Sequence, residues 1–232
     1  MRGGVGSARV VSDWSDLPTA HLASAGRRLK RAELPVDSVS LARYLIGKTL
    51  VRDSEIGRTS GRIVEVEAYV PGDASGHAYI GQTNRNQSLF LRRGHAYVYF
   101  IYGMHFSVNV TSEVAGIGAG VLLRALEPIE GVGIMQTRRV VSRLTDLARG
   151  PGRLAKAMAI DRELDGVDLC VPGPLWLGGE VRPSGQIATS VRIGISKETA
   201  RLLRFYEVGN AHVSGSASLH GRRDWTRNEL YD

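Results

Sequence analysis

Cysteine is almost absent from this sequence: Cys170 is the single one among 232 residues. One cysteine excludes an internal disulfide and any metal site built from several thiolates, and such usage is typical of a reducing compartment. The chain also lacks an apolar run of the ~18–20 residues that span a bilayer, and its first residues lack the apolar centre of a signal peptide. We therefore expect a protein of the cytoplasm, or of the nucleus in a eukaryote, with no membrane partner.

Lysine is scarce as well, although the chain is basic. Only four of the 30 basic residues are lysines, and the formal net charge is +7. Arginine is the better bidentate ligand for phosphate and the better stacking partner. A basic, arginine-rich chain indicates a polyanionic partner, with nucleic acid the first candidate. Because high-GC coding bias also enriches arginine, composition alone does not identify the partner.

The length predicts one domain with a substantial core, or two small ones at most. Residues 1–30 are rich in Gly, Ser, Ala and Arg without a sustained period, which predicts a disordered basic segment. Residues 214–232 are polar and basic, so we expect a flexible tail there. The folded domain is thus expected to span residues 31–213.

Apolar spacing within that domain predicts a mixture of helices and strands. Asp37 or Ser38 can cap a helix, Pro128 can occupy the first position of a second one, and residues 153–160 have the pattern of a third. Short runs rich in apolar and β-branched residues predict the strands. They lie at 49–52, 62–70, 121–126, 191–195 and 203–208, with a turn at 53–60.

Two carboxylates lie within the apolar strand 62–70. Alternation along a strand puts Ile63, Glu65, Glu67 and Tyr69 on one face. A carboxylate in such a strand is costly unless it is paired or used in chemistry. Arg124, in the middle of another apolar strand, needs a carboxylate partner in turn, and either glutamate can supply it.

Residues 95–110 have the pattern of a β-hairpin that bends near Tyr102-Gly103. Tyr97 and Tyr99 share one face of its first arm, and Asn109 lies on the polar face of its second arm. A tyrosine at the bend is poorly placed for packing in the core. The tyrosine side chain can either fold back on its own sheet or point outward and contact another molecule.

Four functions are compatible with these residues. Glu65 and Glu67 could act as the paired carboxylates of a sugar hydrolase. Asp73, His77, His95 and His105 could bind a metal, but their spacing matches no known ligand pattern. Tyrosines and arginines could bind nucleic acid without catalysis. The fourth candidate is a base-excising enzyme with a wedge, an aromatic pocket and one carboxylate that activates water.

Several blocks decide between these functions when they are considered together. The chain from Val39 to Val213 resembles the alkyladenine (3-methyladenine) DNA glycosylase family. The resemblance rests on GRIVEVEAY, QTNRN, AYVYFIYGMHFSVNV, GVLLRALEP, RGPGRLAKAMAI and LRFYEV, which occur in the family's order. It implies an α/β (mixed α+β) fold, a single compact domain around a curved antiparallel β-sheet with a protruding DNA-inserting β-hairpin. It also implies a monomer that acts on double-stranded DNA with damaged purines and uses no metal or other cofactor.

The resemblance also assigns roles to individual residues. Glu67 would deprotonate the attacking water and Arg124 would keep Glu67 ionised, while a backbone carbonyl near Ile193 would contact the water and Glu65 would be structural. The remaining assignments concern DNA. The base pocket would be formed by Tyr69, His77, Tyr99 and Asn109, the intercalating residues would be Tyr102 and Met104, and the backbone contacts would be Arg85 and Arg153.

The same resemblance implies cleavage by water alone. None of the residues that the resemblance assigns a role is a lysine, so no Schiff-base nucleophile is expected and the product would be an abasic site. An electron-rich aromatic slot would favour a cationic alkylated purine. Two departures affect the shape of the pocket: His105 replaces the family's usual bulky aromatic residue, and the loop from Tyr69 to His77 is about one residue short.

Overall fold

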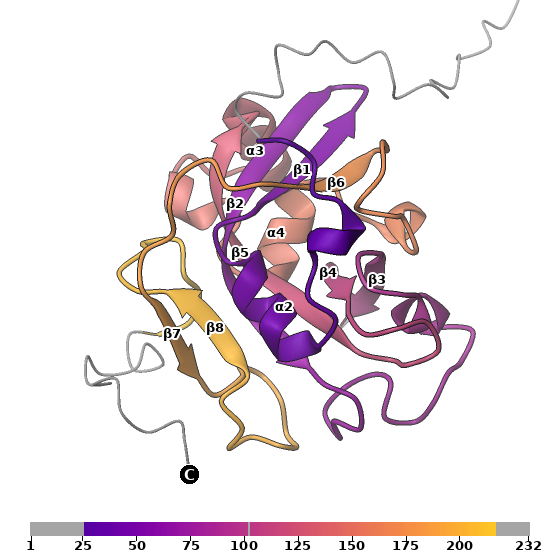
Figure 1. Cartoon of the computed structure of the whole chain (residues 1–232). Coiled ribbons are helices and arrows are strands. Elements are labelled where there is room, and N and C mark those ends of the chain that lie inside the picture. The colour runs from indigo at the N-terminus through magenta and orange to yellow at the C-terminus, as the bar shows by residue number, and fades with distance from the viewer. Residues whose placement is uncertain (1–25, 102, 217–232) are drawn as a thin grey trace, which may run out of the picture.

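A curled antiparallel sheet organises the chain, and the three α-helices of the described part pack against it (Figure 1). The structure is a computed structural model that describes residues 26–101 and 103–216. Its strands are β1 (Thr49–Ser54), β2 (Gly57–Tyr69), β3 (Ala96–Ile101), β4 (His105–Thr111), β5 (Gly120–Glu130), β6 (Leu175–Gly178), β7 (Ile187–Ser190) and β8 (Arg204–Glu207). Its α-helices are α2 (Ser38–Leu45), α3 (Val132–Arg139) and α4 (Pro151–Ala157). Short 3-10 helices cover Arg31–Glu33, Gln87–Phe90, Leu144–Asp146 and Arg162–Leu164.

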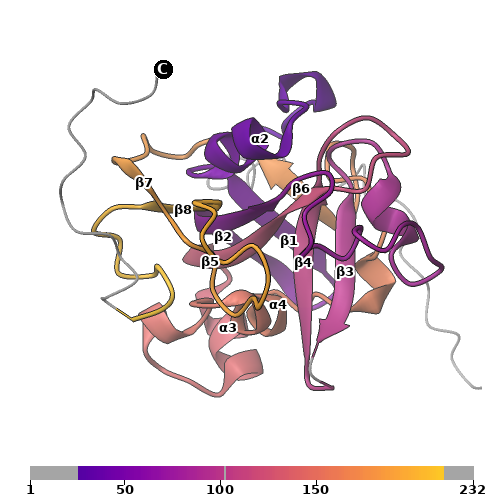
Figure 2. The same ribbon diagram turned by 90° about the horizontal axis from the view of Figure 1, so that it is seen from below.

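The long strand β2 lies at the centre of the sheet. The strand order is β3-β4-β5-β2-β1-β6, and all neighbours are antiparallel. One edge of β2 pairs with β5, while its other edge pairs first with β1 and then with β8, which also pairs with β7. The β3–β4 pair and the β7–β8 pair therefore lie on opposite sides of the molecule (Figure 2). Residues near the end of β2 are surrounded by strands on both sides.

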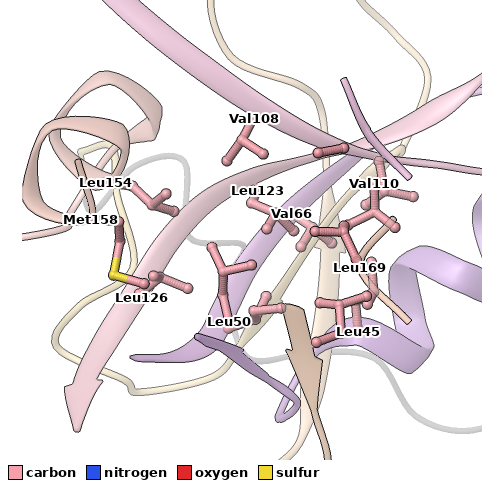
Figure 3. Close-up of a cluster of buried hydrophobic side chains, with 14 of the residues drawn as sticks. Leu45, Leu50, Val66, Val108, Val110, Leu123, Leu126, Leu154, Met158 and Leu169 are labelled. Carbon is pink, nitrogen blue, oxygen red and sulfur yellow. The ribbon is translucent and has the colours of Figure 1, made fainter. Parts of the chain in front are cut away.

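The main hydrophobic core lies between one face of the sheet and the helices. In Figure 3, Leu154 and Met158 meet Leu126 at one end of the cluster, while Leu45 of α2 lies at the other. The helix α2 begins where the sequence predicts, because the Asp37 side chain accepts a hydrogen bond of 2.8 Å from the Ser40 N–H. In the part of the chain described, no helix has the length and apolar character needed to cross a bilayer.

The predicted class, a mixed α/β domain around a curved antiparallel sheet, is confirmed. The strands β3 and β4 pair antiparallel from Ala96↔Val110 to Ile101↔His105, as expected for a hairpin. Tyr102, which the sequence places at its bend, lies outside the described residues. Ser214, the first residue of the expected tail, is buried, so the folded part reaches at least this far.

Four element predictions differ from the structure. The turn expected at 53–60 is much shorter, because β2 already begins at Gly57. Pro128 starts no helix: it lies in β5 opposite Gly61, next to a register shift that accommodates a residue without an N–H. The strand expected at 191–195 lies earlier, at β7, and 191–195 form a loop. The helix expected at 153–160 begins at Pro151 instead, with proline at its first position.

A bulge changes the expected alternation of β2. The register between β2 and β5 shifts between Ile63 and Glu65 and again between Glu65 and Val66. As a result, Ile63 joins Val66 and Ala68 in the main core instead of sharing a face with the glutamates. Val64 packs into a second, smaller cluster on the other side. The bulge therefore leaves Glu65 and Glu67 facing away from the main core.

Candidate active site

Glu65 and Glu67 form the centre of a buried charge cluster. Both carboxylates are completely inaccessible to solvent. Arg124 bridges them: its Nε lies 2.9 Å from Glu65 Oε1 and one terminal nitrogen lies 3.0 Å from Glu67 Oε1. Arg204 adds a second cation, 2.7 Å from Glu65 Oε1. Two carboxylates thus face two guanidinium groups, which balances the formal charges inside the protein.

Glu65 is fully engaged by structural partners. Besides the two arginines, its Oε2 accepts a hydrogen bond of 2.6 Å from the Ser214 N–H, and its Oε1 accepts one of 3.0 Å from the Ser214 hydroxyl. Burial alone would raise the pKa of Glu65, but Arg124 and Arg204 outweigh it and hold this pKa below its usual value. Glu65 is therefore a permanently ionised anchor for the chain segment at Ser214.

Glu67 has a different environment. Its Oε1 accepts a hydrogen bond of 2.7 Å from the Ile193 N–H, and its Oε2 accepts one of 3.0 Å from the Tyr69 hydroxyl. Burial raises the pKa of Glu67 above its usual value, and Arg124 only partly opposes this. We expected Arg124 to dominate the pKa of Glu67 and keep the carboxylate ionised, but the removal of water from the carboxylate has the larger effect on this pKa. A carboxylate with a raised pKa is a stronger base once ionised.

Next to Glu67, a cavity of about 310 Å³ opens against an aromatic wall. All four residues predicted for the pocket, Tyr69, His77, Tyr99 and Asn109, line this cavity. Tyr69 is the link between the two parts of the site, because it lines the cavity and its hydroxyl donates a hydrogen bond to Glu67. Glu67 itself lies beneath the cavity wall.

The sheet register explains why residues far apart in sequence converge here. Tyr97 pairs with Asn109, Asn109 with Leu122, and Leu122 with Glu67, so these residues form one row across four strands. Side chains in one row of an antiparallel sheet point to the same face. Gly120 pairs with Tyr69 in the neighbouring row and, having no side chain, leaves room for the cavity it lines.

The aromatic wall is held together by its own contacts. The ring centroids of His77 and Tyr99 lie 4.4 Å apart at 73°, and those of Tyr97 and Tyr99 lie 5.3 Å apart at 25°. His77 Nδ1 lies 2.8 Å from the Tyr97 hydroxyl, and the Asn109 side chain donates to the Tyr97 carbonyl at 3.2 Å. Burial of the ring lowers the pKa of His77, and Arg85 adds to this effect. The neutral imidazole is therefore favoured at the wall.

Sequence reasoning missed two parts of the site. Tyr97 was assigned to the same face as Tyr99 but not to the pocket, although it lines the cavity and orients His77. The loop 191–197 closes another side of the cavity through its residues 194–197. It includes Lys197, a lysine to which the sequence assigned no role. No periodic pattern marks this loop, and we interpreted its first half as a strand.

Two of the predicted DNA contacts, Met104 and Arg85, lie beside the β3–β4 pair. Met104 is exposed, with 70% of its surface accessible, while Tyr102 lies outside the described residues. The Arg85 side chain donates to the Phe100 carbonyl at 3.3 Å, which places it beside the hairpin. Arg153 is half exposed and lies 3.7 Å from Asp146. The exposed His105, expected to alter the pocket, packs beside Gly152 and does not line the cavity.

The alternative metal site is not assembled. Asp73 forms an ion pair with Arg192, and His95 lies 3.7 Å from Asp168 rather than beside His77 or His105. Within residues 26–101 and 103–216, no group of three or more His, Cys, Asp or Glu side chains is arranged to hold a metal ion.

Comparison with known proteins gives a consistent result. The model of the family described as methylpurine-DNA glycosylase matches residues 32–211. A relative from Mesorhizobium japonicum is 60% identical over 215 residues, which cover 93% of this chain and 99% of the relative. A relative from Paraburkholderia phytofirmans is 48% identical, and the match covers 82% of this chain and 90% of the relative. A relative from Methanoculleus marisnigri is 44% identical, and the match covers 77% of this chain and 94% of the relative. All three are named "Putative 3-methyladenine DNA glycosylase".

Proposed function

Because this chain belongs to the methylpurine-DNA glycosylase family, we propose that it removes alkylated or deaminated purines from duplex DNA by a water molecule that Glu67 activates. The family and its relatives support a DNA glycosylase for alkylated purines. One observation carries the finer proposal. A buried carboxylate with a raised pKa touches, through Tyr69, the aromatic wall of a cavity that can hold a base.

The cavity suits a flat, electron-poor ring. Its volume of about 310 Å³ is within the range of small-molecule sites, and four aromatic side chains contribute to its wall. Alkylation at a ring nitrogen makes a purine cationic, and tyrosine rings attract cations through their electron-rich faces. Such a base would leave its stack in the duplex and enter the cavity, as enzymes that act on single bases require.

The chemical step that we propose needs one general base, that is, one group that accepts a proton. Glu67 accepts a proton from water, the water oxygen attacks C1′ of the deoxyribose, and the glycosidic electrons leave with the purine. A cationic purine leaves without further protonation. Glu67 Oε2 accepts from Tyr69 and, having a second lone pair, can also accept from water. Arg124 and the Ile193 N–H hold Oε1, so Oε2 points toward Tyr69 and the cavity wall.

The hairpin would fill the gap that the extruded nucleotide leaves. Tyr102 is the proposed wedge and Met104 its neighbour, since large apolar side chains at a hairpin tip can separate base pairs from the minor groove. Arg85 and Arg153 are proposed to contact phosphates on either side of it. The protein would act as a monomer on one damaged duplex, without a cofactor.

Two alternatives have less support. A sugar hydrolase needs two usable carboxylates, whereas Glu65 is saturated by two arginines and Ser214. A DNA-binding protein without catalysis would not need a buried carboxylate whose pKa is raised. Activity on aryl glycosides but not on DNA would favour the first alternative.

The proposal is tested with a panel of duplexes, each containing one lesion: 3-methyladenine, 7-methylguanine, hypoxanthine or ethenoadenine. We expect release of the free base from at least one duplex, with an abasic site that alkali then cleaves. Borohydride should trap no covalent complex through Lys197, because water is the nucleophile. Tight binding of lesions without base release would overturn the proposal in favour of a binding protein, and trapping would overturn the water mechanism.

A further inference from the structure

We propose that the buried pair of Arg192 and Asp73, which lies behind Tyr69, sets the pocket's preference between cationic and neutral purines. This inference rests on the proposed function and deepens it. The Arg192 side chain is completely buried and the Asp73 side chain is 1% exposed. Neither residue lines the cavity, and the sequence patterns assign neither of them to the base pocket.

The guanidinium of Arg192 is stacked on Tyr69. Its central carbon lies 4.6 Å from the centroid of the tyrosine ring. Because Arg192 is buried and does not line the cavity, we place it on the face of the ring that points away from the bound base. Tyr69 would thus be placed between a permanent cation behind it and a purine in front of it.

Arg192 is held in this position by four acceptor contacts. It forms an ion pair with Asp73 through both carboxylate oxygens, one of them at 3.2 Å. It also donates to the Ala68 carbonyl at 3.0 Å and to the Ser75 hydroxyl at 2.9 Å. Ser75 in turn donates to Asp73 through its N–H at 3.0 Å and its hydroxyl at 2.7 Å. These contacts therefore hold the cation against the Tyr69 ring.

The pair also joins the two loops that form the site. Asp73 lies in the loop between Tyr69 and His77, and Arg192 is the second residue of the loop 191–197, whose residues 194–197 line the cavity. The next residue, Ile193, donates its N–H to Glu67. One ion pair thus fixes the ring that contacts the base and the amide that holds the catalytic carboxylate.

The charge of Asp73 decides how this arrangement acts on a bound base. A cation behind an aromatic ring repels a second cation in front of it, and a carboxylate on the first cation cancels much of that repulsion. A base stacked on the cavity face of Tyr69 would lie ~9 Å from Arg192, taking the contact above and one ring-stacking distance. With Asp73 ionised, the pair is neutral overall and cationic purines are tolerated. The binding of a neutral purine does not depend on either charge.

The decisive variant is Asp73→Asn, which keeps the shape of the side chain and removes its charge. Single-turnover rates are measured for 7-methylguanine, which is cationic, and for hypoxanthine, which is neutral. We expect the ratio of the two rates to fall on the order of tenfold, from a unit charge at that distance and an effective dielectric constant of ~20. The double variant Asp73→Asn/Arg192→Met removes both charges, and the ratio should return to within about twofold of the wild type.

A matched control is Asp53→Asn. Asp53 is also buried and ion-paired, with Arg58, but it lies in β1 and contacts Trp176 rather than Tyr69. It should leave the ratio unchanged. If Asp73→Asn lowers both rates in parallel, or if the double variant does not restore the ratio, the pair is only structural and the inference is refuted. If the wild type releases neither base, the proposed function itself fails.

Discussion

Replacing Glu67 with glutamine removes the proposed base while keeping the size of the side chain. The amide oxygen can still accept from the Ile193 N–H, but the group can no longer take a proton from water. General-base catalysis contributes roughly 10²- to 10⁴-fold to a rate. The Glu67→Gln variant should therefore release hypoxanthine at least a hundredfold more slowly, which corresponds to about 3 kcal/mol or more in the activation free energy.

The structure also predicts a cost in stability. The cluster of Glu65, Glu67, Arg124 and Arg204 has balanced charges, and the amide leaves it with one excess positive charge. Breaking a buried pair completely costs about 3–5 kcal/mol, so the retained hydrogen bonds should limit the loss of unfolding free energy to about 2 kcal/mol. Urea unfolding followed by circular dichroism measures this loss and shows whether the variant is folded in the assay.

Glu65→Gln provides the matched control, because Glu65 has the same burial, strand and bridging arginine. It should lose comparable stability but retain its rate per folded molecule within about tenfold, since Glu65 does not contact Tyr69 or the cavity. The assay is single-turnover release of hypoxanthine, accompanied by affinity for abasic-site DNA, which should be unchanged in Glu67→Gln. A wild-type rate in Glu67→Gln, or equal losses of rate in both variants, would show that Glu67 has been assigned wrongly as the general base.

Three further results are expected. The rate of hypoxanthine release should fall on the acid side with an apparent pKa above the usual carboxyl value of 4.5, because burial raises the pKa of Glu67 and only the ionised form accepts a proton; a limb at or below 4.5 would contradict this. Burial raises the pKa of Glu207, but hydrogen bonds from Arg62, the Gly185 N–H and Asn210 together outweigh it and hold this pKa at about 2. Because the pKa of Glu207 is lower in the folded state than in the unfolded state, ionised Glu207 contributes about 3 kcal/mol to stability above pH 4.5. This contribution is lost as the pH falls toward 2. Arg62→Met should make the loss of stability with falling pH smaller in acid-unfolding curves. Asp37→Ala removes the cap on Ser40 and should lower the urea-unfolding free energy by about 1 kcal/mol, whereas no change would mean that the cap is not formed.

Much of the fold could be predicted because its signals are local. Asp37 caps a helix through a contact three residues away, and the apolar runs around Glu67 and Arg124 contain their own strand signal. Errors arose where neighbours in space override the local pattern. Pro128 has the sequence signature of a helix start, but the register shift between β2 and β5 places it in a strand.

The pocket residues likewise divide into those that could be predicted from the sequence and those that only the structure identifies. Tyr69 and Tyr99 were assigned to the pocket through the family resemblance, and alternation along the strands gave only the faces on which they lie. Tyr97 has the same pattern as Tyr99, and only the hydrogen bond to His77 shows that it belongs to the wall. Nothing in the spacing of Asp73 and Arg192 indicates a pair, since 119 residues separate them.

The sequence by itself determined the mixed α/β class, the strand that includes Glu67, and the aromatic residues that the cavity needs. The class and the strand depend on side-chain periodicity and caps, which act over a few residues, whereas the aromatic residues of the cavity were implied by the family resemblance. Only the tertiary structure decided that Tyr69 connects Glu67 to the cavity, that burial raises the pKa of Glu67 despite Arg124, and that Arg192 lies behind the aromatic wall. The physical reason is that desolvation and ion pairing depend on which groups surround an atom in space, and strand register and loop closure set those surroundings.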